Sequence, residues 1–135
     1  MKRLILSVLA TGAMICTSFS PLMADDLNQS GNAFLRHCSV AEKDHDLTSA
    51  DQFNEQLCEA YIAGFVEGAS EEIGFSRSKG ESPSQLFCLQ DSSNFEGAQW
   101  VRIVVKYIRA NPETANLRTA ALVTRAFQAA FPCRA

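Results

Sequence analysis

Cysteine spacing restricts the possible folds of this chain more than any other feature of its sequence. Five cysteines occur, and the last stands two residues from the C-terminus: Cys16, Cys38, Cys58, Cys88 and Cys133. A cysteine near a free end is explained if it ties a terminal helix to an upstream segment through a disulfide. Whether disulfides form depends on the compartment, which the N-terminus indicates.

The first residues have the pattern of a secretory signal peptide. Met1-Lys2-Arg3 is a short basic region, and the apolar stretch LILSVLATGAMIC that follows is too short to cross a bilayer. We expect cleavage after Ala24, which would leave residues 25–135 as one exported, soluble domain without a membrane segment. Lipidation at Cys16 is the alternative, but the bulky Ile15 stands where a small residue is needed.

Composition after cleavage describes a small acidic domain. Residues 25–135 are enough for a single modest core. Removing Lys2 and Arg3 from 12 basic side chains leaves 10 against 15 acidic ones, a net charge of about −5. No basic stripe or aromatic platform is present, which argues against a nucleic-acid partner.

The four cysteines that remain form an even set in an exported domain. Exported thiols are oxidised, so we expect two disulfides. The alternative is a metal site that also uses His37 and His45, but the chain has no CxxC pair and the spacings are wide. We therefore predict neither a metal nor another cofactor.

Helical periodicity dominates the second half of the chain. A helix is predicted over 94–110, where Ser93-Asn94-Phe95-Glu96 has the form of a capping box and Asn111-Pro112 ends the helix; its apolar stripe is Val101, Val104, Val105 and Ile108. A second helix is predicted over 113–130, with Leu117, Ala121, Phe127 and Phe131 on its apolar face. The short linker folds the two back on each other, which brings Cys88 near Cys133.

By elimination, Cys38 pairs with Cys58 in the first half of the chain. Helices are predicted over 28–39 and 50–74, and Ser49-Ala50-Asp51-Gln52 reads as the capping box of the second. The bridge would join these two helices across the polar loop VAEKDHDLTSAD. The predicted fold is all-α, a small bundle of about four main helices with two disulfides and no sheet.

Two glycines interrupt the helix predicted over 50–74. Tyr61, Gly64, Phe65 and Gly68 share one face, and each interior glycine costs about 1 kcal/mol relative to alanine. We interpret them as a site of close packing inside the bundle. The alternative is a helix crossing between two copies of the chain.

A long polar segment, SRSKGESPSQLFCLQDSSN, separates the two halves. Loops of this length are uncommon without a function, so it is the first candidate for a recognition surface, with a solvated connector as the alternative. Gly80 and Pro83 shape the loop, and the Cys88 bridge holds its end. The candidate binding residues are Arg77, Lys79, Gly80, Glu81, Ser82, Ser84 and Gln85.

Catalytic motifs are not evident. Asp44-His45-Asp46 is the strongest local cluster, but a single histidine in a polar loop is usually exposed, and no G-x-S-x-G, HExxH or P-loop pattern occurs. Because the cysteines are assigned to bridges, no thiol nucleophile remains. We therefore do not expect an enzyme.

Several motifs in this order resemble the Rap/Tai family of type VI secretion immunity proteins. They are Cys58-x-x-Tyr61-x-x-Gly64-x-x-x-Gly68, Cys88-Leu89, VVKYIRANPE at 104–113 and LVTRAFQAAFPC at 122–133. The resemblance implies a small, disulfide-bonded, helical periplasmic protein. Such proteins bind peptidoglycan-cleaving amidase toxins with a Cys-His active site and occlude the substrate groove, commonly as dimers.

The resemblance implies an amidase effector protein as the partner and a homodimer as a possible assembly. Gln90 and Asn111 depart from residues that are usual in the family, a proline and a histidine, and we transfer no binding residue from it. The alternative function is a periplasmic housekeeping module, chaperone-like or ligand-binding, with no toxin partner. A neighbouring gene for a secreted amidase would favour the immunity function.

Overall fold

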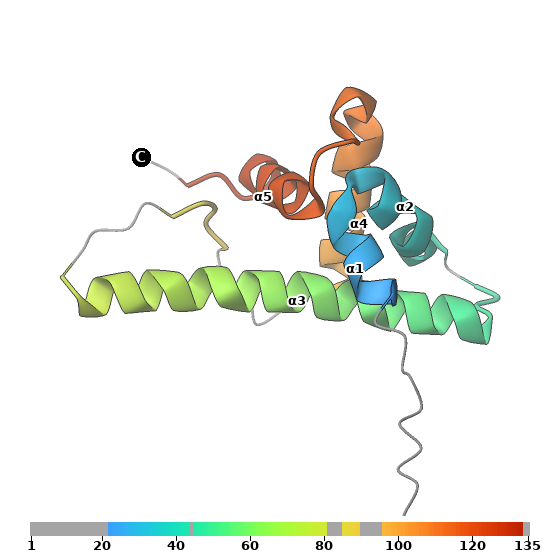
Figure 1. Cartoon of the computed structure of the whole chain (residues 1–135), viewed down its shortest axis with the longest axis horizontal. Helices are drawn as coiled ribbons and strands as arrows, with labels where there is room; N and C mark the ends of the chain where they lie inside the picture. Colours follow the sequence, from blue (N-terminus) through green and yellow to red (C-terminus); the bar gives the residue numbers. More distant parts are fainter. Residues whose placement is uncertain (1–21, 44, 81–84, 90–95, 134–135) are drawn as a thin grey trace, which may run out of the picture.

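The computed structural model describes residues 22–43, 45–80, 85–89 and 96–133 of the chain (Figure 1). Across these residues the protein is helical, without a strand. The elements are α1 (Leu22–Gln29), α2 (Gly31–Cys38), the 3₁₀ turn η1 (Ser39–Glu42), α3 (Ser49–Ser78), α4 (Gly97–Ala110), the 3₁₀ turn η3 (Pro112–Thr114) and α5 (Thr119–Ala130). The predicted all-α fold is confirmed. The proposed signal peptide lies almost wholly outside the described residues.

The 30-residue helix α3 forms one edge of the molecule. It is about 45 Å long at 1.5 Å per residue, and Figure 1 shows α2, α4 and α5 on one side of it. α4 lies at the centre, because it packs against α2, α3 and α5. None of the helices described here is long and apolar enough to span a membrane.

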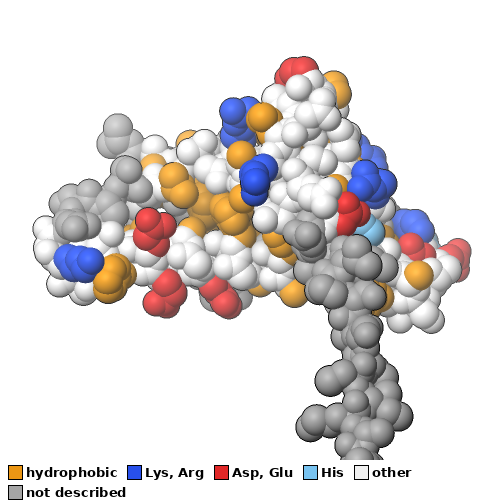
Figure 2. Space-filling view, viewed as in Figure 1, with side chains coloured by type: hydrophobic (Ala, Val, Ile, Leu, Met, Phe, Trp, Pro, Cys, Tyr) orange, Lys and Arg blue, Asp and Glu red, His pale blue; other side chains and the backbone are white. Residues whose placement is uncertain are grey.

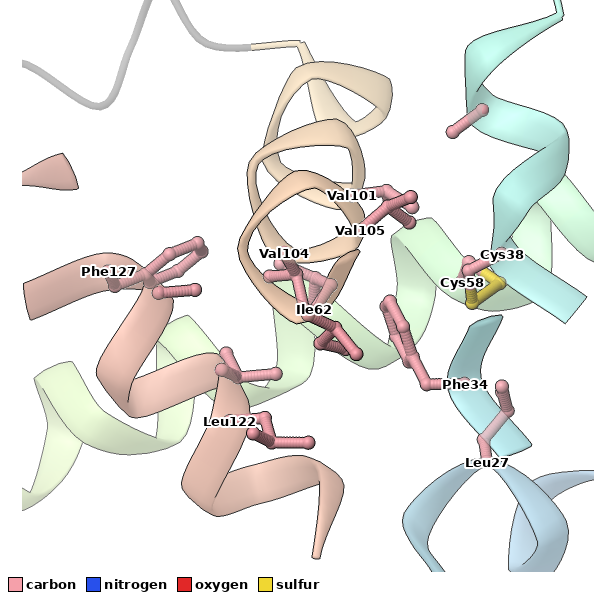
Figure 3. Packing of buried hydrophobic residues seen from close by; sticks show 14 of the residues in the cluster. Leu27, Phe34, Cys38, Cys58, Ile62, Val101, Val104, Val105, Leu122 and Phe127 are labelled. Carbon is pink, nitrogen blue, oxygen red and sulfur yellow. A yellow bond between two sulfur atoms is a disulfide. The ribbon is translucent and has the colours of Figure 1, made fainter. Parts of the chain in front are cut away.

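The core is built where α4 meets its three neighbours (Figure 3). The predicted stripe of α4 is fully buried, and it meets Phe34 from α2, Ile62 from α3, and Leu122 and Phe127 from α5. Each such side chain contributes about 1.5 to 3 kcal/mol when it leaves water. The stripe therefore organises the whole fold.

Both predicted disulfides are confirmed. Cys38 and Cys58 are fully buried and join α2 to α3, with 5.7 Å between their Cα atoms. Cys88 and Cys133 join the 85–89 segment to the chain end, with Cα atoms 5.0 Å apart. The bridges span 20 and 45 residues, so unfolded-chain entropy gives them about 3 and about 4 kcal/mol in the loop-closure model.

The helix predicted over 28–39 is instead two helices that break at Ser30. The Ser30 hydroxyl accepts a hydrogen bond from the Ala33 amide at 3.2 Å and begins α2 as its N-cap. The turn lets Gly31 pack against α5, and an added Cβ there would lie 2.4 Å from Leu122 Cδ1. This contact between distant segments explains the break, which local periodicity did not reveal.

The bounds of the long helix also differ from the prediction. Thr48, and not Ser49, is the N-cap, and it forms a capping box with Asp51. α3 runs to Ser78, beyond the predicted end at residue 74, because nothing in IGFSRS breaks a helix. As a result Arg77, which the sequence placed in the loop, is helical.

The last two helices begin later than predicted. α4 starts at Gly97, and Ser93 to Phe95 of its predicted capping box lie outside the described residues. Only one 3₁₀ turn follows Pro112, and α5 starts at Thr119. Of the predicted apolar face, Phe127 is buried, but Leu117 and Ala121 are exposed; the buried residues are Thr119, Leu122, Val123, Ala126 and Phe127.

The interpretation of Gly64 and Gly68 as close-packing sites inside the bundle is wrong. Both glycines are exposed, and within the described part of the protein no atom lies within 4 Å of a Cβ added to either. They lie on the side of α3 that faces away from the core residues Ile62 and Val66.

Candidate functional site

A groove of about 510 Å³ lies between the C-terminal half of α3 and the 85–89 segment. Figure 2 shows hydrophobic side chains gathered on this face between α3 and α5, with acidic side chains along α3 beside them. The groove is lined by Val66, Ala69, Ser70, Glu72, Ile73, Ser76, Gln85, Leu86, Phe87, Cys88 and Leu89. We call it the α3 groove.

The 85–89 wall of the groove is held by aromatic packing and by the second disulfide. The Phe87 ring stacks on Phe65 with 6.4 Å between centroids and meets Phe127 edge-on at 5.1 Å. The Cys88 amide donates a hydrogen bond to the Phe131 carbonyl at 3.0 Å, beside the Cys88–Cys133 bridge. These contacts fix the wall before any partner arrives, which lowers the entropy cost of binding.

The α3 wall of the groove is amphipathic. Val66, Ala69 and Ile73 lie at helical spacing and give an apolar floor. Among the lining residues Glu72 is the one ionisable side chain, and Ser70 and Ser76 add hydroxyl groups. The groove suits an apolar side chain that carries a basic or hydrogen-bonding group at its edge.

The predicted binding loop begins where α3 ends. Arg77 lies in the last turn, Lys79 is the C-cap and Gly80 adopts a left-handed φ of 76°, which glycine favours. The Lys79 ammonium lies 4.2 Å from the centroid of the exposed Phe75 ring. Gln85, at the far end of the loop, lines the α3 groove. Glu81, Ser82 and Ser84 lie outside the described residues.

The other polar loop differs in character. His45 and Asp46 are exposed, Asp44 lies outside the described residues, and the nearby Lys43 forms an ion pair with Asp51 at 2.8 Å. Where the chain is described, no group of three potential metal ligands comes together.

The sequence reasoning missed the α3 groove itself. The predicted helix ended at residue 74, and residues 76–94 were predicted as one loop. The prediction therefore did not place Leu86, Phe87 and Leu89 opposite the C-terminal end of this helix. The recurrence of Val66, Ala69 and Ile73 beyond Phe65 was the available signal, because it continues the apolar face along the helix.

Comparison with known proteins identifies the family. The sequence model of the Rap1a immunity proteins matches residues 30–133, which include both disulfides, the α3 groove and the predicted loop. The chain belongs to the Rap1a immunity protein family. No curated protein and no solved structure matched. Rap1a proteins are inhibitors and not enzymes, which confirms the prediction that this chain is not an enzyme.

Membership of the Rap1a family also indicates the kind of partner that the chain binds. The family implies a cognate amidase effector of a type VI secretion system.

Proposed function

We propose that this Rap1a protein is a periplasmic immunity protein that binds a peptidoglycan amidase toxin and occludes its substrate groove. The family match over 30–133 carries this proposal. Two disulfides support an oxidising compartment, and the proposed signal peptide at 1–24 provides the route to the periplasm. By resemblance to the family, the active form is a homodimer.

We assign the contact with the toxin to the loop at residues 77–85, together with the α3 groove into which its end leads. The support is geometric: Arg77 and Lys79 supply charge at one end of the loop, and Gln85 lines the groove at the other. Charged groups at such a rim speed association and select the partner. The apolar floor of the groove, formed by Val66, Ala69 and Ile73, supplies burial, which gives affinity.

Occlusion requires no chemistry from the inhibitor. An amidase that hydrolyses peptidoglycan must admit an extended substrate to its nucleophile, and a bound protein wall excludes that substrate sterically. The immunity protein must only bind tightly enough to remain in place, and a preformed surface favours slow dissociation.

The test uses a purified type VI amidase effector, which should be sought first among the genes next to this one. The mature protein is expected to copurify with that amidase, to block its hydrolysis of purified peptidoglycan, and to protect cells that express the amidase in the periplasm from lysis. Expression without the signal peptide is the matched control and should not protect. Failure to bind or block the amidase would overturn the proposal.

A further inference from the structure

The two disulfides differ in how far solvent reaches them. Cys38 and Cys58 are both 0% exposed and lie inside the core (Figure 3). Cys133 is exposed, and Cys88 is half-buried. A thiol reduces a disulfide by attacking one of its two sulfur atoms, so that sulfur must be accessible. A reductant should therefore open the Cys88–Cys133 bridge before it reaches the buried one.

The accessible bridge is also the one that belongs to the α3 groove. Cys88 lines the groove and lies within its 85–89 wall, and the bridge ties this wall to Cys133, which follows α5. The buried bridge lies elsewhere, because Cys58 stands about two helical turns, roughly 12 Å, before Val66, the first lining residue on α3. Opening the accessible bridge therefore acts on the groove directly.

The noncovalent contacts of the 85–89 wall are few enough for it to open locally. Phe87 is half-buried and meets the Phe127 ring edge-on at 5.1 Å, and the Cys88 amide donates a hydrogen bond to the Phe131 carbonyl at 3.0 Å. Leu86 keeps 48% of its surface exposed. Segments with much exposed surface open at low cost while the core remains folded. The covalent link therefore matters more for this wall than for the helices.

We propose that the Cys88–Cys133 bridge is a redox switch for toxin binding. Oxidation fixes the 85–89 wall and completes the α3 groove, and reduction releases the wall while the rest of the fold stays intact. The buried stripe of α4 and the Cys38–Cys58 bridge hold α2, α3 and α5 in both states. This inference rests on the proposed function, because it describes the regulation of the surface that we assign to the toxin.

Opening the bridge is a two-electron thiol–disulfide exchange. One thiolate of a dithiol reductant bonds to Sγ of Cys133, and Cys88 leaves as a thiolate. The second thiolate of the reductant then bonds to the first sulfur and displaces Cys133. The two protons lost by the reductant complete the two protein thiols, and the reductant leaves as a disulfide. A disulfide oxidant reverses these steps.

The state of the switch follows the compartment. Thiols are kept reduced in the cytoplasm and are oxidised after export. The chain therefore acquires its complete binding surface only in the compartment where the amidase reaches peptidoglycan. A copy still in the cytoplasm leaves an amidase made in the same cell unbound.

Limited reduction of the folded protein tests the order of opening. The mature protein is treated with increasing dithiothreitol, quenched with iodoacetamide and mapped by mass spectrometry. Cys88 and Cys133 should be alkylated at concentrations that leave Cys38–Cys58 closed, with an unchanged helical circular dichroism spectrum. Earlier or simultaneous opening of the buried bridge would overturn the switch.

Hydrogen exchange tests whether the wall is released, without any amidase. In the double variant Cys88→Ser with Cys133→Ser, the amide of residue 88 should exchange about tenfold faster or more, because the wall opens locally. The amide of Val104, in the core, should exchange as in the wild type. Unchanged exchange at residue 88 would contradict the release.

Binding separates the failure of the switch from the failure of the proposed function. A purified amidase effector is titrated calorimetrically with the oxidised protein, the singly reduced protein freed of reductant, and the double serine variant. The last two should bind about tenfold more weakly or worse, since the apparent affinity falls with the fraction of time that the wall is in place. Oxidised glutathione should restore binding by the wild type and not by the variant.

Equal binding by the oxidised and the singly reduced protein would overturn the switch and leave amidase inhibition standing. Oxidised protein that does not bind the amidase would overturn the proposed function, and with it the role of the switch.

Discussion

The carboxylate of Glu59 on α3 lies against the first residue of α4, and a Cβ added to Gly97 would come within 3.0 Å of the Glu59 carboxylate oxygen Oε2. Glu59 also accepts a hydrogen bond from the backbone of Ala98. Because α4 has no capping side chain of its own at Glu96, Glu59 acts as a cap supplied by another helix. This contact joins the long helix to the central one at the point where α4 begins.

Gly97→Ala should therefore destabilise the fold although alanine is the better helix former. The added methyl group would displace the Glu59 carboxylate from Ala98, and a lost N-terminal cap costs about 1 kcal/mol. Chemical denaturation of Gly97→Ala, Glu59→Ala and the double variant measures the coupling. Once Glu59 is alanine, the further change Gly97→Ala should no longer lower the unfolding free energy. Additive effects of the two changes would contradict the capping role.

Glu59 also predicts a pH dependence. Burial, followed by the nearby Glu55 and Glu96 carboxylates, raises the pKa of Glu59 above its ordinary value of 4.5. The folded state then binds a proton more readily than the unfolded chain, so this contribution to stability is complete below 4.5 and is lost as pH rises through the folded-state pKa. As pH rises through the folded-state pKa of Glu59, the melting temperature of Glu59→Gln should increase relative to that of the wild type. A constant difference between pH 4 and 7 would contradict this.

The stability that Asp51 contributes depends on pH in the opposite direction to that of Glu59, and at lower pH. Hydrogen bonds from Lys43 and Thr48 lower its pKa from 3.8 to about 2. The folded state favours the carboxylate, so the stabilisation is present above 3.8 and is lost as pH falls toward 2. The wild type should therefore melt higher than Asp51→Asn at pH 6, and the difference should disappear near pH 2. Glu113→Gln, for an exposed carboxylate in η3, is a matched control with little expected effect at either pH.

The two disulfides should differ in how much unfolding free energy is lost when each is removed. Cys88→Ser with Cys133→Ser removes a bridge between the half-buried Cys88 and the exposed Cys133, so the unfolding free energy should fall by up to about 4 kcal/mol while the helical signal persists. Cys38→Ala with Cys58→Ala removes about 3 kcal/mol of loop closure and also fully buried sulfur atoms. Urea unfolding should show the larger loss for the buried pair. A loss of no more than about 3 kcal/mol for the buried pair would mean that core packing around Cys38 contributes little.

These bridges show what the sequence could reveal. Each joins elements whose closeness follows from chain order, because short connections keep successive helices adjacent. The central stripe from Val101 to Ile108 was predictable for a similar reason, since its period is a local property. The fold class and both cysteine pairs were accordingly within reach of the sequence.

The positions of the glycines and of Leu117 were not predictable in this way. Gly64 and Gly68 share an apolar-looking face with Phe65, yet which side of α3 faces the core depends on where α4 and α5 pack. Leu117 continues a helical pattern, but the chain after Pro112 makes a 3₁₀ turn before α5 begins. The α3 groove depends on the same tertiary packing, so its walls could not be paired from local pattern alone.

The final prediction concerns the loop that we assign to toxin binding. Replacing Lys79-Gly80-Glu81-Ser82 with a neutral linker of equal length should weaken amidase binding at least tenfold, a loss of about 1.4 kcal/mol. The melting temperature should stay nearly unchanged, because Lys79 and Gly80 are exposed and the Lys79 contact with Phe75 is a surface interaction. Calorimetric titration against the amidase and thermal melts measure the two quantities.

Ile73→Arg, on the floor of the α3 groove, separates the loop from the groove. If the groove receives part of the toxin, the arginine of Ile73→Arg should weaken toxin binding through its bulk and charge. For the loop variant, weaker binding with an unchanged melting temperature would show that the loop contacts the toxin and does not act through folding. Weak binding of Ile73→Arg beside normal binding of the loop variant would assign recognition to the groove alone. Normal binding by both would move the contact away from this face, to the loop around Asp46 or to another helix face.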